Sequence, residues 1–211
     1  MWQSSLWYIF PTALAVLLCF VIAWHAWRLR PRRGAGYVAL LMLVVAWWSL
    51  TSIFEIVSST LPSKLCWVKI EYPAIAFIGI AWFLLMREYL GQAPRLSRRA
   101  LAGTCLIPTL TVLLAWTNGW HHLMYTRAYL DTRFTIPILV FERGIWFWLF
   151  YVYLCGLVLL GVAYGLQGWL YAHPLYRRQL LAMLGGGFFP SWSISPMSFT
   201  RASHHCWTLH P

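Results

Sequence analysis

The fold of this chain is decided by residues 47–86, which read WWSLTSIFEIVSSTLPSKLCWVKIEYPAIAFIGIAWFLLM. They complete one apolar run, Tyr37–Val57, and contain the next, Cys66–Met86, with a short polar turn between the two. Each run has about 21 residues, enough for a helix to cross a hydrocarbon layer about 30 Å thick. The sequence therefore predicts a transmembrane helical hairpin.

Three charged residues lie inside these two runs: Glu55 near the end of the first, and Lys69 and Glu71 near the start of the second. In an antiparallel hairpin the end of one helix lies beside the start of the next, so Glu55 and Lys69 come to a similar depth. An ionisable side chain costs roughly 2.5–3.5 kcal/mol at the bilayer centre, so it usually faces protein and finds a partner. We expect a buried Glu55–Lys69 ion pair. The alternative is that each side chain snorkels separately into the headgroups.

The composition indicates an integral membrane protein. Hydrophobic residues make up 61% and charged residues 10% of the 211 positions, whereas a soluble domain carries about 25% charge. The 15 tryptophans fit helices with aromatic belts at both headgroup levels. A net charge of +11 would suggest nucleic acid in a soluble protein, but here the arginines cluster between apolar runs, where they set orientation. The expected partner is the lipid bilayer, and nucleic acid is not expected.

Further apolar runs extend the hairpin into a bundle. The first span, Leu6–Trp27, precedes the hairpin, and the fourth, Leu101–Trp116, is short and interrupted by Pro108. The fifth span, Gly144–Gln167, is long, and the sixth begins normally at Leu180 but stops at Pro190. Between the fourth and the fifth span, residues 118–143 form the longest polar segment, which we expect to be a loop on the outer side.

The basic residues predict the orientation of this bundle. The loops after the first, third and fifth spans hold ten Lys and Arg, and the alternate loops hold four. Positive charge favours the cytoplasmic side, so the N-terminus is expected outside. The run lengths and the lack of strict alternation exclude a β-barrel. The predicted fold class is an all-α membrane protein, an antiparallel transmembrane helix bundle with five full spans and an incomplete sixth.

Several short motifs follow one another in a defined order along these spans. The second span ends in Phe54-Glu55-x-x-Ser58, and the third begins Trp67-x-Lys69-x-x-Tyr72. The later motifs are Thr117-Asn118-x-x-His121, Gly144-x-x-Phe147-Trp148 with Tyr151 and Tyr153, and Tyr176-Arg177-x-Gln179 followed by Pro190. Together they resemble the N-terminal seven-transmembrane sensor region of bacterial histidine kinases, which also precedes cyclase output domains.

The resemblance covers about residues 6–190 and implies that residues 1–190 form a transmembrane sensor domain. It implies a signal-sensing input role in a two-component system and a multi-pass location in a bacterial inner membrane. The family continues with a seventh helix and a cytoplasmic transmitter, for which this chain has no residues left. No nucleophile pattern, cofactor motif or paired carboxylates are recognisable either. We therefore expect a chain that is not itself an enzyme and that binds no cofactor.

Residues 191–211 are too polar to finish a sixth helix or to form a seventh. If the gene is read one nucleotide earlier, the codons of His205–Thr208 must encode Leu-Leu-Asp, whichever synonymous codons are used. The codons of the last residues can then supply Thr and Pro, which gives the Asp-x-Thr-Pro stretch that the family has at this place. We therefore expect this irregular tail to be out of frame. Its His204, His205, Cys206 and His210 then lack the fold and the outer hydrogen-bond shell of a metal site, so no metal site is expected.

The resemblance also implies where a signal would bind. Polar and aromatic residues gather in the outer half of the predicted bundle, and concave sites between helices commonly combine apolar walls with a few convergent polar groups. The candidates for contacting a small apolar or amphipathic signal, or for forming the structural ion pair, are Glu55, Lys69, Trp67, Tyr72, Asn118, His121, Trp148 and Tyr151. Trp116, Trp120 and Trp146 lie nearby. The alternative for each tryptophan is an interfacial belt.

Two interpretations remain open. Gly161-x-x-x-Gly165 in the fifth span permits close helix approach, either within one chain or in a homodimer. The whole chain could instead be a small transporter or permease subunit, although the charges inside the spans are confined to one hairpin and no inverted repeat is visible. A truncated product without function is the third alternative.

Overall fold

The computed structural model describes residues 2–30, 32, 34–89, 96–133 and 137–171. Five helices in this part of the chain are long and apolar enough to cross a membrane. Their bounds, with those of two strands, are α1 Trp2–Arg28, α2 Ala35–Val57, α3 Leu61–Tyr89, α4 Arg98–His121, β1 Tyr125–Asp131, β2 Ile138–Arg143 and α5 Ile145–Tyr171. The mostly helical membrane fold is therefore confirmed.

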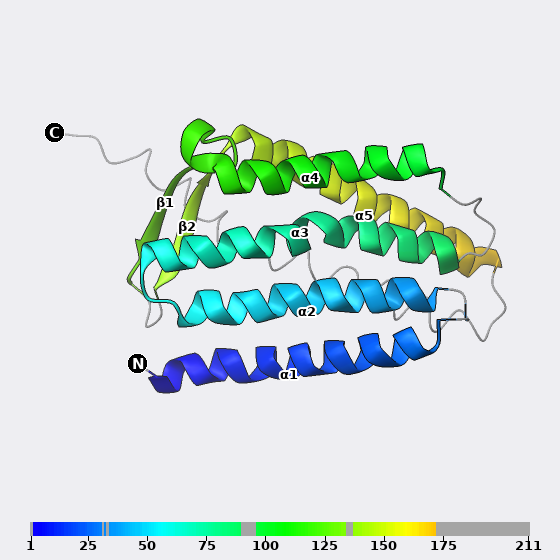
Figure 1. The fold of residues 1–211 in the computed structure, drawn as a ribbon, viewed down its shortest axis with the longest axis horizontal. Helices are drawn as coiled ribbons and strands as arrows, with labels where there is room; N and C mark the ends of the chain where they lie inside the picture. Colours follow the sequence, from blue (N-terminus) through cyan, green and yellow to red (C-terminus); the bar gives the residue numbers. More distant parts are fainter. Residues whose placement is uncertain (1, 31, 33, 90–95, 134–136, 172–211) are drawn as a thin grey trace.

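Consecutive helices run in opposite directions, so the bundle has two distinct ends (Figure 1). One end carries the α2–α3 turn, the end of α4, the two strands and the start of α5, and we call it the hairpin end. The other carries the α1–α2 connection and residues such as Arg28, Arg30, Arg87 and Arg98, and we call it the arginine end.

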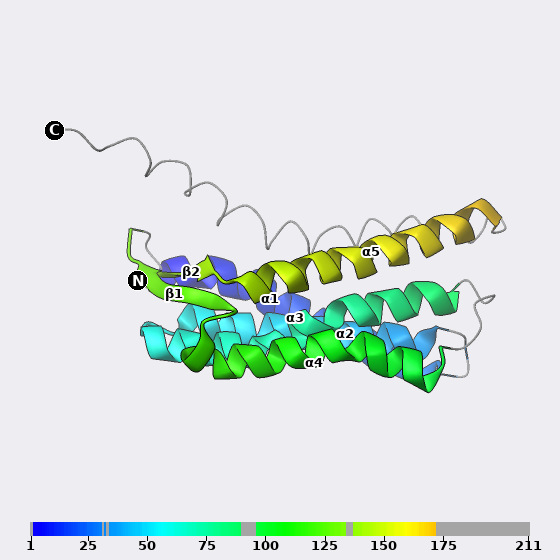
Figure 2. The same cartoon turned by 90° about the horizontal axis from the view of Figure 1, so that it is seen from above.

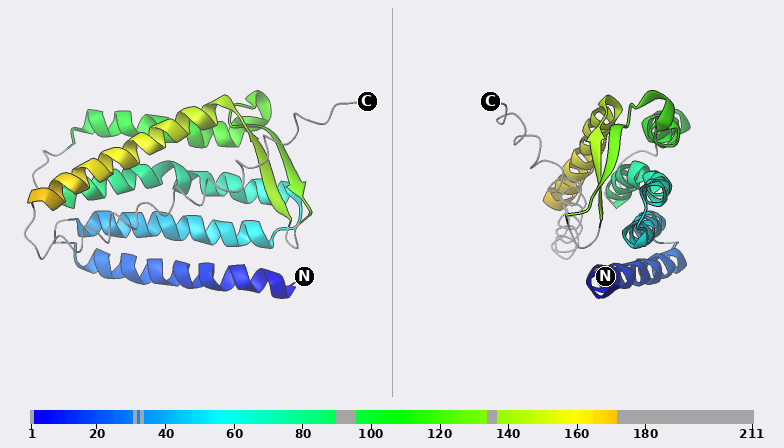
Figure 3. Two further views of the ribbon diagram at one scale, coloured as in Figure 1. Left: turned by 180° about the vertical axis from the view of Figure 1, so that it is seen from behind. Right: turned by 90° about the vertical axis from the view of Figure 1, so that its left-hand side faces the viewer.

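Helix α3 is the centre of the bundle. It packs against α2, α4 and α5, whereas α1 packs chiefly against α2. Seen from above and end-on, α1 to α4 form a curved row, and α5 lies across one face of it (Figures 2 and 3). Half of the most apolar stretch of α3 is buried, against 17–22% for the other four helices. The remaining apolar surface faces outward, as expected where lipid is the solvent.

Small residues bring these helices close together. Ala39 and Ala46 of α2 are fully buried, and Gly79 of α3 faces Leu154 of α5 so closely that a methyl group would lie 2.6 Å from its Cδ1. At Gly161 of α5 an added Cβ would lie 2.6 Å from the Trp82 indole nitrogen of α3. Without a hydrophobic effect between helices in lipid, such close contact supplies much of the packing energy. For Gly161, the interpretation as packing within one chain is therefore confirmed.

Helix α4 is longer than predicted because a capping side chain sets its start and the left-handed residue His122 sets its end. The Ser97 hydroxyl accepts a hydrogen bond from the Ala100 N–H at 3.1 Å, which starts the helix. Pro108 does not end it. A proline lacks the N–H that would bond the carbonyl four residues earlier, here Thr104, and the Tyr153 hydroxyl of α5 donates to that carbonyl at 2.6 Å.

The expected outer loop is a β-hairpin. Strands β1 and β2 pair antiparallel, with Tyr129 opposite Val140 and Leu130 opposite Leu139. The first four residues of the predicted loop complete α4 instead. The β-branched and aromatic residues of 125–143 alternate too weakly for a sequence pattern to identify the strands, yet their backbone groups find partners in each other. The all-α assignment is corrected to this extent.

Candidate functional site at the hairpin end

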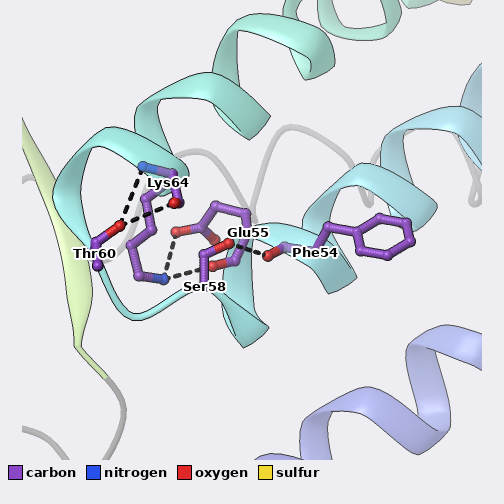
Figure 4. Close-up of polar contacts among 6 residues, drawn as sticks. Phe54, Glu55, Ser58, Thr60 and Lys64 are labelled. Carbon is purple, nitrogen blue, oxygen red and sulfur yellow. Dashed lines mark hydrogen bonds and ion pairs between the residues drawn. The ribbon is translucent and has the colours of Figure 1, made fainter.

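Glu55 forms an ion pair with Lys64 and not, as predicted, with Lys69. The Lys64 Nζ lies 2.9 Å from Glu55 Oε1 and 2.7 Å from the main-chain oxygen of Glu55 (Figure 4). The Lys64 side chain is 1% exposed and that of Glu55 22%. The ammonium group therefore neutralises the carboxylate and also satisfies a carbonyl in the last turn of α2, where helical N–H partners run out.

The predicted pair failed because α3 begins five residues earlier than expected, at Leu61. The Thr60 hydroxyl accepts from the Ser63 N–H at 3.4 Å, and a proline in the first turn does not interrupt a helix, so Lys64 becomes helical. Positions 64 and 69 differ by about 140° around a helix, so only one can face α2. Lys69 faces α4, with its Nζ 3.4 Å from the Trp116 carbonyl oxygen.

The motif Phe54-Glu55-x-x-Ser58 forms the rest of this turn. The Phe54 ring stacks on Trp67 of α3 with centroids 4.5 Å apart and planes at 15°. The Ser58 hydroxyl and its N–H both donate to the Phe54 carbonyl oxygen, at 2.8 and 3.1 Å. Each motif residue therefore makes a contact that fastens α2 to α3 or ends α2, and this accounts for the residue types without a ligand.

A second carboxylate lies deeper between the same helices. The Ser52 hydroxyl of α2 is 3.1 Å from Glu71 Oε1, and the indole N–H of Trp47 donates to the Ile70 carbonyl oxygen at 3.0 Å. The predicted site did not include Ser52 or Trp47. Pro73 lies inside α3 and leaves the carbonyl of Lys69 without its helical donor, but it gave no signal for Ser52 or Trp47.

Asn118 connects α4 to the β-hairpin and is 1% exposed. Its Oδ1 accepts from the main-chain N–H groups of Met124 and Tyr125 at 2.8 and 3.3 Å, and its Nδ2 donates to the Tyr125 carbonyl oxygen at 2.8 Å. The carboxamide thus makes the hydrogen bonds that a neighbouring strand would make at the start of β1. Nearly all of its hydrogen-bonding capacity is used within the protein.

His121 belongs to the same connection. The Leu123 N–H donates to its Nδ1 at 3.1 Å, which makes Nδ1 an acceptor and assigns the ring proton to Nε2. The Nε2–H then donates to the Thr117 hydroxyl at 3.0 Å, and that hydroxyl donates to the Leu113 carbonyl oxygen at 2.8 Å. The next residue, His122, adopts a left-handed conformation at φ 53°, which ends α4. The Thr-Asn-x-x-His motif builds a turn.

Tyr72 lies beneath this turn, 5% exposed, in a cluster with Ala115 and Met124. Trp146 of α5 packs against the same cluster, and its indole N–H donates to the fully buried Thr111 hydroxyl of α4 at 3.0 Å. Helices α3, α4 and α5 are thereby joined at one level. Thr111 was missed because a threonine inside an apolar run usually bonds its own helix, as it also does here with Ile107.

Trp148 and Tyr151 lie apart from the other candidates. Trp148 is 47% exposed, and it contacts Phe147 and Tyr151 of its own helix edge to face. Trp116 and Trp120 are also exposed, at 53% and 88%. This exposure at the hairpin end supports the interfacial-belt alternative for these three tryptophans.

The candidate residues therefore form three groups rather than one pocket. The α2–α3 turn holds Glu55 and Trp67. The contact of α3 with α4 and β1 holds Lys69, Tyr72, Asn118 and His121. The flank of α5 holds Trp148 and Tyr151. Within the described ranges no group of three His, Cys, Asp or Glu residues lies close enough to hold a metal ion. The predicted sixth span and the tail with His204 to His210 lie outside the described residues.

Two groups of the hairpin have perturbed acidities. Burial lowers the pKa of the Arg143 guanidinium, with a smaller opposing effect from Tyr72. Burial also raises the pKa of the Tyr125 hydroxyl, and a hydrogen bond with Asn118 acts in the opposite direction. Both shifts disfavour the charged form, so this part of the hairpin end is poorly solvated even though it lies beside exposed strands.

Comparison with known proteins gave one family. The model described as N-terminal 7TM region of histidine kinase matches residues 11–202, which extends past Pro190, where the resemblance was expected to end. No curated protein and no solved structure matched the chain. The match covers most of the chain and includes all five membrane-length helices wholly or in large part. This chain belongs to the family of N-terminal seven-transmembrane regions of histidine kinases.

Proposed function

We propose that this chain is the signal-sensing input domain of a membrane histidine kinase or cyclase, with its hairpin end outside a bacterial inner membrane. The family match is the observation that carries the proposal. The distribution of arginines supports the orientation, because the described arginines of the loops expected inside, such as Arg28, Arg87 and Arg98, lie at the arginine end. The chain itself carries out no catalysis in this proposal.

The hairpin end offers a route from an outside signal to the helices. The β-hairpin connects α4 to α5 directly, and it is tied to α4 by Asn118 and to α3 through the Met124–Tyr72 contact. A ligand that prefers one position of the hairpin would also prefer one tilt of α5 against α3. It can shift that equilibrium only by its difference in affinity for the two states.

The test follows the distance between α3 and α5 at the arginine end. The native cysteines are replaced, spin labels are placed at Glu88 and Gln167 of the full chain in lipid nanodiscs, and decanoate or decanol serves as an amphipathic or apolar probe. A sensor should show a changed label distance with a probe that binds, or in the variant Asn118→Ala, which loosens the hairpin. The control Trp120→Ala, at an exposed position, should leave the distance unchanged.

An unchanged distance under all these conditions would contradict the proposal. The alternative of a transporter is tested on the same preparation, since uptake of a solute into proteoliposomes above the level of empty vesicles would favour it. The chain has intramembrane charges in α2 and α3 but no second set in α4 or α5, which gives the transporter less support.

A further inference from the structure

Arg143 occupies a fixed position at the junction of β2 and α5. The Gly144 N–H donates to the Met124 carbonyl oxygen at 2.9 Å, and the Trp146 N–H donates to the Leu123 carbonyl oxygen at 3.0 Å. A side chain at Gly144 would collide with the Leu123 carbonyl oxygen, so the two segments are in close contact. The main chain on the C-terminal side of Arg143 is therefore held, and its side chain starts from a defined point.

Two aromatic rings hold the guanidinium group itself. Its Cζ lies 4.3 Å from the centroid of Phe147 and 5.3 Å from that of Phe141, within the range of cation–π attraction. Tyr125 is its cross-strand partner, and the buried hydroxyl of Tyr72 acts on it electrostatically. The side chain is only partly accessible. This is an organised and poorly hydrated surrounding for a permanent positive charge.

Among the described residues, no carboxylate forms an ion pair with Arg143. The sequence has five acidic residues, all within the described part. Glu55 pairs with Lys64, Glu142 with Arg127, and Asp131 with Arg133. Glu71 accepts from Ser52 between α2 and α3, and Glu88 lies at the arginine end of α3. Partly buried charges are normally paired. Arg143 departs from this rule, because its five N–H donors have no acidic partner among the described residues.

We propose that Arg143 is the head-group contact of a binding site for an amphiphile with a carboxylate or phosphate oxyanion. A planar guanidinium held by aromatic rings can bind such a group through two parallel hydrogen bonds. The Tyr72 hydroxyl, which acts on Arg143 electrostatically, is a neighbouring donor. The proposal deepens the proposed function, because it names the chemical class of the signal and places its charged end at the hairpin end.

The flank of α5 supplies a surface for the tail of such a molecule. Phe147 and Tyr151 lie one turn apart in the first part of α5, and their rings stack with centroids separated by 6.2 Å. Trp148 of the same helix contacts both rings edge to face and is 47% exposed. Arg28 also stacks on a tryptophan, Trp24, but both side chains are exposed at the arginine end and need no ligand to be solvated.

The test measures binding of radiolabelled decanoate to the full chain in phosphatidylcholine nanodiscs. We expect saturable decanoate binding, and we expect Arg143→Gln to weaken it at least tenfold. Decanol and acetate should be poor competitors, because decanol lacks the carboxylate and acetate lacks the apolar tail. The matched control is Arg127→Gln, on the same hairpin but 79% exposed and paired with Glu142, which should change the affinity less than twofold. Equal binding by Arg143→Gln, or equal competition by decanol, would overturn the proposal.

Further variants and lipids complete the test. Phe147→Leu removes the stacked ring without removing the charge and should weaken decanoate binding severalfold with the fold intact, which covers the case that Arg143→Gln fails to fold. If phosphatidylglycerol in the nanodisc competes with decanoate, the occupant is a lipid head group; if it does not, the occupant is a free amphiphile. Both results support an oxyanion site. Decanoate that binds through Arg143 without changing the Glu88–Gln167 distance would contradict the sensor while leaving the site in place.

Discussion

The hairpin end and the arginine end of this bundle are stabilised by different interactions. At the hairpin end the helices are joined by directed polar contacts, such as Lys64 with Glu55 and Asn118 with the start of β1. Toward the arginine end the contacts are apolar and close, as where Trp82 and Met86 of α3 meet Gly161 of α5. Polar contacts can be exchanged for contacts with a ligand, whereas close packing of small residues resists a change of spacing.

This difference fits a domain that senses at one end. A change at the hairpin end can alter which hydrogen bonds form, while the packed half of α3 and α5 moves as a unit and carries the change along its length. The contrast leads to four predictions about the free energy of unfolding, each measured by circular dichroism in mixed micelles of dodecyl maltoside and SDS.

The largest loss is expected from Lys64→Met. This change keeps the length of the side chain but leaves Glu55 without its partner in a buried position, which costs about 3–5 kcal/mol. Lys69→Met is the matched control and should cost less than about 1 kcal/mol, because Lys69 makes one long bond to a carbonyl. Exchanging the charges of positions 55 and 64 should not restore stability, since a carboxylate at 64 would face the Glu55 carbonyl oxygen. Equal losses for the two lysines would refute the assignment of the pair.

Asn118→Ala should destabilise by about 3 kcal/mol, because three hydrogen bonds to β1 are lost and their backbone partners stay in a buried position. Asn118→Asp keeps the Oδ1 acceptor but loses the donor to the Tyr125 carbonyl oxygen, so its loss should be intermediate. Hydrogen exchange at Met124 and Tyr125 should rise in both variants. Unchanged exchange would show that the side chain does not hold the hairpin.

Gly161→Ala should cost about 2 kcal/mol by overpacking against Trp82 in the apolar half. The control is Gly156→Ala in the same helix, where an added methyl group meets nothing within 4 Å. That variant should be neutral or slightly stabilising, because alanine favours a helix over glycine. A gain of stability at both positions would show that helix propensity outweighs contact with α3.

The smallest effect is expected from Thr111→Val, which leaves the Trp146 indole N–H without its acceptor and should cost about 1 kcal/mol. Thr111→Ser keeps the hydroxyl and should retain the hydrogen bond. If valine is tolerated better than serine, packing rather than hydrogen bonding decides this contact between α4 and α5.

The sequence identified the helices better than it identified their contacts. Span boundaries in α2 and α5 were close to those observed, because apolar run length sets them. The starts of α3 and α4 were misplaced, because Thr60 and Ser97 cap these helices from within polar stretches. The predicted Glu55–Lys69 pair was wrong, because Glu55 pairs with Lys64. Which lysine it is depends on the angle around α3, and a shift of five residues in the start of the helix decides it.

The sequence by itself determined that this protein is embedded in a lipid bilayer. Long apolar runs with arginines between them can be satisfied only by helices in a bilayer, since a backbone in hydrocarbon must bond to itself. The family motifs were recognisable for the same reason, as each ends or begins a span. The tertiary structure decided which polar groups meet, because that depends on helix rotation and on the hairpin that seats Asn118, Tyr72 and Arg143 at one level, and neither is encoded by run length or hydropathy.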